Sequence, residues 1–461
     1  MKLTRKDIFY AVLFTTYLLT YMIVLSVSDD LGRAADATGY LSHYYPGITR
    51  ILGFASFWVS RRFIPREGAR RSLLIAAGCI FLISAALLTL NPTGSFLLPI
   101  LLALSLSLGH LGGLIYYCIS VAFSMNSYKG RLIGFSCAAS VLLQYILAGH
   151  TGVVAQLIIA AAIFLLISYL ILKTPANFIL EDPLPYSGTD EAFDRNVRRQ
   201  LLLIIGVIVL CSLLACRTDI AFLSLSYSSD VNIYSYPRLM MLAGYLIMGF
   251  AADKRSRSIV GITFFGGVLM SALLILMPFT DGSYSLFLSV YYFFISFYIF
   301  FYTYFFISVA PRTHSPELWA SMGRPLSDLC SAPVSFIMLR LGSERLNSSP
   351  LSYAIYYLLL LIALYILMAV LKPDPNLTDA GSDTHTGEEI SLDNLLSAYS
   401  LTPRERDVAA LLITTELPIK AIAAELGISE RSVYRFCSSI YEKTGTDNRI
   451  GLVKEFYSRL S

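Results

Sequence analysis

Charged side chains are scarce in this chain of 461 residues, in which Asp, Glu, Lys and Arg make up 14% and histidine occurs 5 times. An ordinary soluble domain carries about 25% charged residues, so the low share excludes that class. The hydrophobic share is 56% and the mean hydropathy is +0.65. We therefore expect an integral membrane protein, with the lipid bilayer as its first partner.

Cysteine is infrequent as well, with 7 residues, and no phosphate-binding loop or metal-ligand cluster occurs in the sequence. The cysteine spacing suits neither a disulfide framework nor a zinc site, and these residues read as small apolar side chains. A nucleotide-driven pump and a membrane enzyme both lose their main support. We expect a protein that is not an enzyme and that has no cofactor and no metal.

The sequence does contain many apolar runs long enough to cross a membrane. We count twelve, at about 8–28, 41–60, 72–90, 96–123, 132–149, 152–172, 201–225, 232–251, 259–278, 284–310, 326–342 and 350–371. Basic residues precede the first run as in a signal peptide, but eleven further runs favour a retained helix. We predict an all-α membrane bundle over 1–371, with halves 1–172 and 201–371 joined by a cytoplasmic loop at 173–200.

Basic residues mark alternate connections between these runs. They gather in 61–71, in 254–257 and around Arg312 and Arg324, which we take as residues flanking one connection, while 91–94 and 279–283 carry almost none. Since lysine and arginine concentrate in cytoplasmic loops, both termini are expected to face the cytoplasm.

One of these connections holds a motif. Gly249-Phe-Ala-Ala-Asp253-Lys254-Arg-Ser-Arg257 resembles the cytoplasmic loop motif of the major facilitator superfamily. Its first-half counterpart, which starts at Arg61-Arg62, is degenerate and lacks the acidic residue in its usual place. Together with the six-plus-six division, the resemblance implies a transporter-like bundle built from two repeats.

Residues 372–398 differ sharply from the bundle. This segment is acidic, contains proline and glycine, and has almost no large apolar residue before Ile390. Such a composition cannot bury enough apolar surface to fold, so we predict a flexible acidic linker.

A polar segment at 399–461 follows. Two short amphipathic runs flank Leu426-Gly427-Ile428-Ser429, where Gly427 can end one helix in the left-handed conformation and Ser429 can cap the next. Thr402 and Glu405 form the pattern of a capping box that starts an earlier helix at Pro403. One face of each run is apolar, through Ile422, Ala423, Leu426, Val433, Phe436, Cys437 and Ile440. These signals predict a helix-turn-helix.

The same segment carries further landmarks in order. Leu401-Thr402-Pro403-Arg404-Glu405-Arg406, then Val433, Ile440, Lys443-Thr444-Gly445 and Asn448-Arg449, resemble the LuxR-type (GerE-like) domain of bacterial transcription regulators. The resemblance implies a small four-helix domain that binds double-stranded DNA, with RNA polymerase as a further partner. It also implies a homodimer on DNA through the last helix, by way of Leu452, Val453, Phe456 and Leu460; packing within a single domain explains these residues nearly as well.

The second run of the helix-turn-helix carries a polar face. The resemblance implies base contacts from Tyr434, Arg435 and Ser438 and phosphate contacts from Lys420, Arg431, Ser432 and Lys443. An arginine can bind guanine with two hydrogen bonds, which suits Arg435 to reading sequence. A merely solvated charged face is the alternative for Arg431 and Arg435.

Ionisable residues inside apolar runs are costly and therefore informative. We predict that Arg50 and Arg238 face a central cavity suited to an anionic or carbonyl-bearing ligand, and we add His110 and Asp219 as candidates. Pairing between helices, for instance of Arg217 or Arg238 with Asp219, is an equally open alternative. The aromatic run 291–306 reads more readily as lipid-facing bulk than as a pocket, and Gly109 and Gly113 read as helix-packing positions.

Two hypotheses about function follow. In the first, the protein is a one-component transcription regulator of the bacterial cytoplasmic membrane, whose transporter-like bundle senses an unknown small molecule. In the second, it is a working secondary transporter with a regulatory DNA-binding or protein-binding tail. A DNA-binding domain with all its landmarks and a degraded loop motif favour the first.

Overall fold

A computed structural model describes residues 5–35, 40–64, 67–90, 96–124, 126–173, 198, 201–202, 204–213, 215, 233–254, 259–263, 265–269, 284–313, 315–340, 358, 361–365, 399, 401–414, 419–446, 449 and 451–453. These residues are nearly all helical and contain no strand. The chain divides into two compact units, Met1–Ser382 and Asp383–Ser461. The division falls within the segment predicted as a linker, and residues 372–398 themselves lie outside the described residues.

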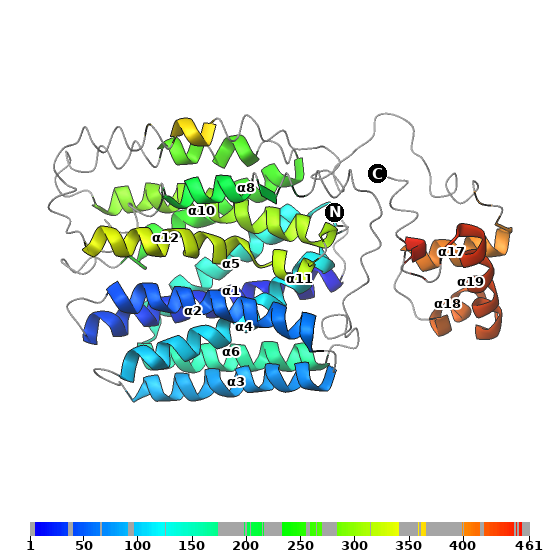
Figure 1. Ribbon diagram of the computed structural model, residues 1–461, viewed down its shortest axis with the longest axis horizontal. Helices are drawn as coiled ribbons and strands as arrows, with labels where there is room; N and C mark the ends of the chain where they lie inside the picture. Colours follow the sequence, from blue (N-terminus) through cyan, green and yellow to red (C-terminus); the bar gives the residue numbers. More distant parts are fainter. Residues whose placement is uncertain are drawn as a thin grey trace. The chain divides into compact units, whose positions relative to one another are not determined.

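The first half of the membrane unit holds six helices that match the first six apolar runs. They are α1 (Arg5–Ala35), α2 (Tyr40–Phe63), α3 (Glu67–Thr89), α4 (Leu97–Ala122), α5 (Lys129–His150) and α6 (Val153–Lys173). The helices lie side by side with roughly parallel axes, and α3 and α6 are neighbours (Figure 1).

The second half is described in part. Its elements are the 3-10 turn η3 (Tyr236–Leu239), α8 (Met240–Lys254), α10 (Tyr284–Val309), the 3-10 turn η5 (Ala310–Arg312), α11 (Pro316–Trp319) and α12 (Gly323–Arg340). Within the described residues, six helices are long and apolar enough to cross a membrane, which makes this a multi-pass membrane protein. The runs at 201–225, 259–278 and 350–371 extend beyond the described residues, so the count of twelve stays a prediction.

Two helix pairs provide the most extensive contacts between the halves within the described residues. α5 of the first half packs against α8, and α2 packs against α12. In the six-plus-six order, α2 and α8 are the second helices of their halves, and α5 and α12 are the fifth. Each contact therefore becomes the other when the halves are exchanged, which is the arrangement expected of two related repeats.

The aromatic run of α10 lies inside the bundle. Tyr298, Phe300, Phe301, Tyr302, Tyr304, Phe305 and Phe306 are all buried. The expectation that this run is mainly lipid-facing bulk was therefore wrong. Composition cannot distinguish a lipid-facing helix face from one inside the bundle, because lipid and a packed interior accept the same apolar side chains. The helices that pack against α10, among them α8, determine that this face is buried.

α2 and α4 approach closely because glycine faces glycine. A Cβ atom added at Gly53 would overlap the backbone oxygen of Leu106, and one at Gly109 would overlap the backbone oxygen of Arg50. A Cβ atom at Gly113 would lie 2.8 Å from Cβ of Phe57. The prediction that Gly109 and Gly113 are packing positions is confirmed.

This close approach predicts the effect of a single methyl group. Gly53→Ala should force α2 and α4 apart and destabilise the membrane unit by about 1–3 kcal/mol. The check is the temperature at which half of the full-length protein, in detergent, is lost from the monodisperse peak. Gly149→Ala is the matched control, because its added Cβ meets no atom within 4 Å. Equal losses in the two variants would show that the α2–α4 approach is not limiting.

The second unit has its own core. Its described helices are α17 (Pro403–Thr414), α18 (Ile419–Leu426) and α19 (Glu430–Thr444), and residues 449 and 451–453 are also helical. Val408, Leu412, Ile422, Val433 and Ile440 are completely buried against one another. The apolar faces predicted for the two runs are confirmed, with Leu426 and Phe436 at the margin of this core.

Candidate functional site

The turn of the helix-turn-helix forms as its residues predict. Gly427 has a φ of 64°, a left-handed conformation that few other residues adopt readily. The Ser429 hydroxyl caps α19 by accepting a hydrogen bond from the backbone nitrogen of Ser432 at 3.1 Å. Gly445, with a φ of 67°, ends the helix. α19 thus begins and ends at fixed residues.

One face of α19 stays free of the core. Arg431, Tyr434, Arg435 and Ser438 are exposed, and the side chain of Tyr434 is 60% exposed. The Ser432 hydroxyl forms a hydrogen bond with the capping residue, at 2.9 Å from the hydroxyl of Ser429. Polar side chains therefore project from a helix whose opposite side is anchored, as a DNA-reading helix requires. The side chain of Lys420 lies outside the described residues.

A buried carboxylate ties α19 to α17. Glu405 is 5% exposed and completes the predicted capping box, accepting a hydrogen bond from the backbone nitrogen of Thr402 at 2.7 Å. Its two oxygens also accept hydrogen bonds from the Ser439 hydroxyl and from Nζ of Lys443, each at 2.7 Å. Lys443, predicted as a phosphate contact, thus uses one of its three donors within the domain.

Glu405 makes the stability of this domain depend on pH. Burial by itself raises the pKa of the carboxyl group, but hydrogen bonds from Lys443, Ser439 and Thr402 outweigh burial and lower the pKa from 4.5 to about 2. Because the folded-state pKa lies below the unfolded one, the stabilisation is complete above pH 4.5 and is lost as the pH falls from 4.5 towards 2. The loss should be about 3 kcal/mol.

The measurement is urea unfolding of residues 383–461, a unit with its own core, at several pH values between 2 and 7. Glu405→Gln serves as the control, since a residue that cannot ionise should remove most of the dependence. An unchanged pH profile in that variant would assign the dependence to other carboxylates.

The last helix packs at least partly on its own domain. Arg449 donates a hydrogen bond from Nε to the backbone oxygen of Leu412 at 2.9 Å, and Leu452 is completely buried in the core. Val453 is half-buried. Leu452 therefore packs within one copy, whereas Phe456 and Leu460 lie outside the described residues.

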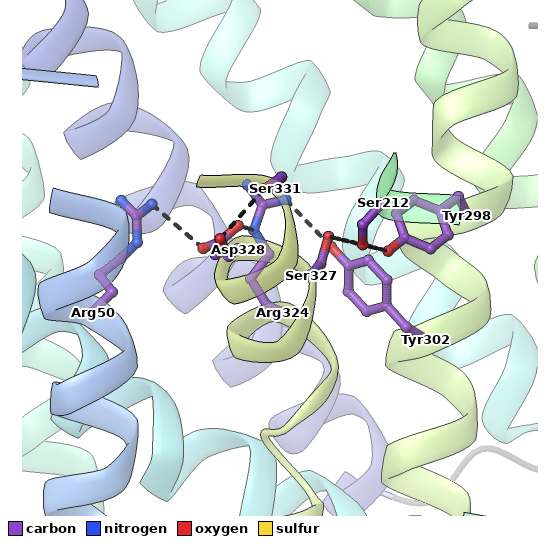
Figure 2. Close-up of polar contacts among 8 residues, drawn as sticks. All are labelled: Arg50, Ser212, Tyr298, Tyr302, Arg324, Ser327, Asp328 and Ser331. Atoms are coloured by element: carbon purple, nitrogen blue, oxygen red, sulfur yellow. Dashed lines mark hydrogen bonds and ion pairs between the residues drawn. The ribbon is translucent and has the colours of Figure 1, made fainter. Parts of the chain in front are cut away.

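A second candidate site lies at the contact between α2 and α12. Nη2 of Arg50 lies 3.7 Å from Oδ2 of Asp328, and Nε of Arg324 lies 3.0 Å from Oδ1 of the same carboxylate (Figure 2). The guanidinium carbons of the two arginines lie 4.8 and 5.5 Å from the ring centre of Tyr21 on α1. Arg324 also donates a hydrogen bond to the hydroxyl of Tyr302 at 3.3 Å.

This cluster extends the expectations for Arg324 and Arg50. Arg324 borders the connection that precedes α12, as predicted, but from the first turn of this helix its side chain points towards Asp328 and Tyr302 (Figure 2). Arg50 pairs with Asp328, which the sequence analysis did not single out. The spacing Arg-x-x-x-Asp at the start of an apolar run was the available signal, because it places both charges on one helix face.

A group of hydroxyls lies beside this cluster, around Ser327, which directly precedes Asp328 on α12. The hydroxyls of Ser212 and Tyr298 lie 2.6 Å apart, and Tyr298 donates to the hydroxyl of Ser327 at 3.1 Å (Figure 2). Ser212 also bonds to the backbone oxygen of Ile208 at 2.7 Å. These uncharged groups satisfy one another and hold the second half together.

The other candidate ligand residues lie elsewhere. Arg238 lies in η3, ahead of α8, with its guanidinium carbon 4.7 Å from the ring centre of Tyr234. The Tyr234 hydroxyl in turn donates to the Asp29 carboxylate of α1. His110 packs between α4 and α2, with Nδ1 2.8 Å from the Ser56 hydroxyl. Arg217 and Asp219 lie outside the described residues, and so does their proposed pairing.

The loop motif of the second half joins the two halves. Asp253, at the end of α8, accepts hydrogen bonds from the backbone nitrogen of Gly130 and from Nε of Arg131, both at 2.7 Å. These donors are at the start of α5, where free backbone N–H groups favour a carboxylate. In the degenerate first-half copy, Arg61 is buried and donates to the Tyr117 hydroxyl of α4 at 3.0 Å.

Comparison with known proteins agrees with this division into two units. A family model described as bacterial regulatory proteins of the luxR family matches residues 399–456, which form a LuxR-type DNA-binding domain. The crystal structure of the human organic anion transporter MFSD10 (TETRAN) is similar to 79% of this chain and 99% of that chain, with a TM-score of 0.52 and 16% sequence identity. This likeness shows a fold of the major facilitator type. No curated protein matches the chain in sequence.

Proposed function

We propose that this protein is a membrane-bound one-component transcription regulator, in which the transporter-like bundle senses a small molecule and the LuxR-type domain binds DNA. The observation that carries the proposal is a LuxR-type domain with a free, arginine-bearing helix face on the same chain as a membrane bundle. LuxR-type domains bind DNA, and neither they nor transporter-like bundles are enzymes in general.

The proposal gives roles to the exposed residues of α19. Tyr434, Arg435 and Ser438 contact bases, while Arg431, Ser432, Lys420 and Lys443 contact phosphates. The domain binds DNA as a homodimer through Val453, Phe456 and Leu460, with Leu452 supporting that surface from the core, and acts together with RNA polymerase. Both termini face the cytoplasm of a bacterial cell, which keeps the domain where DNA is.

For the bundle, we propose an anionic ligand. Two arginines and one aspartate meet at the α2–α12 contact, so the net charge of these three side chains is +1. Arg238, His110 and Asp219 are further candidates to contact the ligand, with Arg238 favoured because its Nε and Nη1 are buried and have no hydrogen-bond partner among the described residues. A buried, positively charged group of donors favours a molecule rich in acceptors.

Genome occupancy of the full-length protein in its own cell tests the proposal. Wild type is compared with a variant in which Arg431 and Arg435 are both alanine. Discrete promoter peaks that vanish in the variant are the expected result. No peaks under any growth condition would contradict it.

The alternative is a secondary transporter with a regulatory tail. The observation in its favour is Asp253 of the loop motif, which accepts hydrogen bonds from Gly130 and Arg131 at the α5–α8 contact. Its test is gradient-driven uptake of a panel of organic anions into proteoliposomes. Uptake that is lost in Arg50→Ala, without promoter occupancy, would establish the transporter.

A further inference from the structure

The α2–α12 cluster contains more hydrogen-bond donors than acceptors. Nε of Arg50, Nε of Arg324 and the hydroxyl of Tyr21 are buried and have no hydrogen-bond partner among the described residues. Asp328 is the carboxylate that both Arg50 and Arg324 approach. Since an unsatisfied buried donor is costly, this cluster is suited to a further acceptor.

The two contacts of Asp328 are both ion pairs, and they differ in length and in the helix that supplies the arginine. The contact with Arg324 is 3.0 Å long and lies within α12, with Arg324 four residues earlier on the same helix face. The contact with Arg50 is 3.7 Å long, beyond ordinary hydrogen-bond length, and reaches across to α2. Asp328 can therefore lose Arg50 and keep Arg324 as its counter-charge.

The longer contact lies where the halves of the bundle meet. α2 belongs to the first half and α12 to the second, and their packing is one of the two most extensive contacts between the halves among the described residues. Arg50 is 3% exposed, so it cannot exchange Asp328 for bulk water. Whatever replaces Asp328 at Arg50 must supply its own negative oxygen atoms.

We propose that Asp328 is a displaceable internal counter-ion. In the ligand-free protein, Asp328 pairs with Arg50 and holds α12 to α2. When the ligand binds, its carboxylate forms two hydrogen bonds with Arg50 and displaces Asp328. The α2–α12 contact between the halves is then released. This inference rests on the proposed sensing of an anion, and it names the ligand group as a carboxylate and the α2–α12 contact as the element that responds.

The chain provides its own reporters of this contact. It has 2 tryptophans, Trp58 on α2 and Trp319 on α11, the short helix that leads into α12 and packs against α2. Trp319 stacks on Phe306 of α10 with the ring planes 5° apart. Trp58→Phe leaves Trp319 as the reporter, and Trp319→Phe leaves Trp58.

The experiment measures tryptophan emission of the full-length protein in lipid nanodiscs. Asp328→Asn should shift the emission without any ligand, and Asp328→Glu, which keeps the charge, should not. Asp29→Asn is the matched control, because it removes another buried carboxylate that lies beside Tyr234. A melting curve of each variant shows whether it is folded.

Sodium benzoate is then titrated, with benzamide as its neutral counterpart. Benzoate should shift the emission of the wild-type protein towards that of Asp328→Asn. Asp328→Asn should bind benzoate about tenfold more tightly than the wild type does. The emission of Arg50→Gln should not respond to benzoate. Emission of Asp328→Asn equal to wild type, an equal response to benzamide, or no response to either probe would each overturn the inference. Since this readout does not involve DNA, absence of promoter occupancy would contradict the proposed function alone.

Discussion

Replacing Arg435 by alanine is expected to weaken binding to a specific operator by about 1–3 kcal/mol, roughly 5- to 150-fold, and to relax base choice at one position. The reason is its place on the exposed face of α19, where a guanidinium can bind a guanine edge with two hydrogen bonds. The measurement is fluorescence anisotropy of residues 383–461, with an operator taken from the occupancy peaks and a random duplex of equal length.

Arg404→Ala is the control for loss of charge alone. Arg404 lies on α17 with its side chain 63% exposed, paired loosely with Asp407 at 3.9 Å. Its loss should weaken both duplexes slightly and equally, because an exposed charge acts without regard to sequence. If Arg435→Ala also weakened both duplexes equally, Arg435 would be a phosphate contact.

Glu405→Gln is expected to destabilise the LuxR-type domain by about 2–3 kcal/mol at neutral pH. The amide keeps the size of the carboxylate but loses its charge, which leaves Nζ of Lys443 without its 2.7 Å partner. The side chain of Lys443 is 33% exposed, so water compensates in part. Urea unfolding of residues 383–461 at pH 7 measures the loss.

A double-mutant cycle separates this ion pair from the rest of the network. Lys443→Met removes the ammonium group and leaves Glu405 with hydrogen bonds from Ser439 and Thr402. Glu405→Gln should therefore lower the free energy of unfolding by less in the Lys443→Met background than in the wild type. A coupling energy near zero would show that the pair contributes nothing and that the hydrogen bonds from Ser439 and Thr402 dominate. Ser439→Ala, expected to cost about 1 kcal/mol, measures one of these bonds.

Most of the LuxR-type domain could be predicted because its signals are local. A glycine with positive φ at Gly427, a cap at Ser429 and a capping box at Thr402 and Glu405 depend on residues within four positions of one another. The period of apolar residues then predicts which face of α19 is buried. Lys443 was assigned to DNA, and its additional bond to Glu405 was missed, since the two residues lie on different helices.

The sequence by itself determined the membrane class, the first six helices and the helix-turn-helix, because hydrophobicity and helix signals act over one or two turns. Only the tertiary structure decided which charges meet. Arg50 and Asp328 lie on helices far apart in sequence, Arg324 at the start of α12 turns towards Asp328 and Tyr302, and the aromatic face of α10 is enclosed by the bundle. In a bilayer both lipid and protein accept an apolar surface, so hydrophobicity marks a helix as spanning but does not select its neighbours.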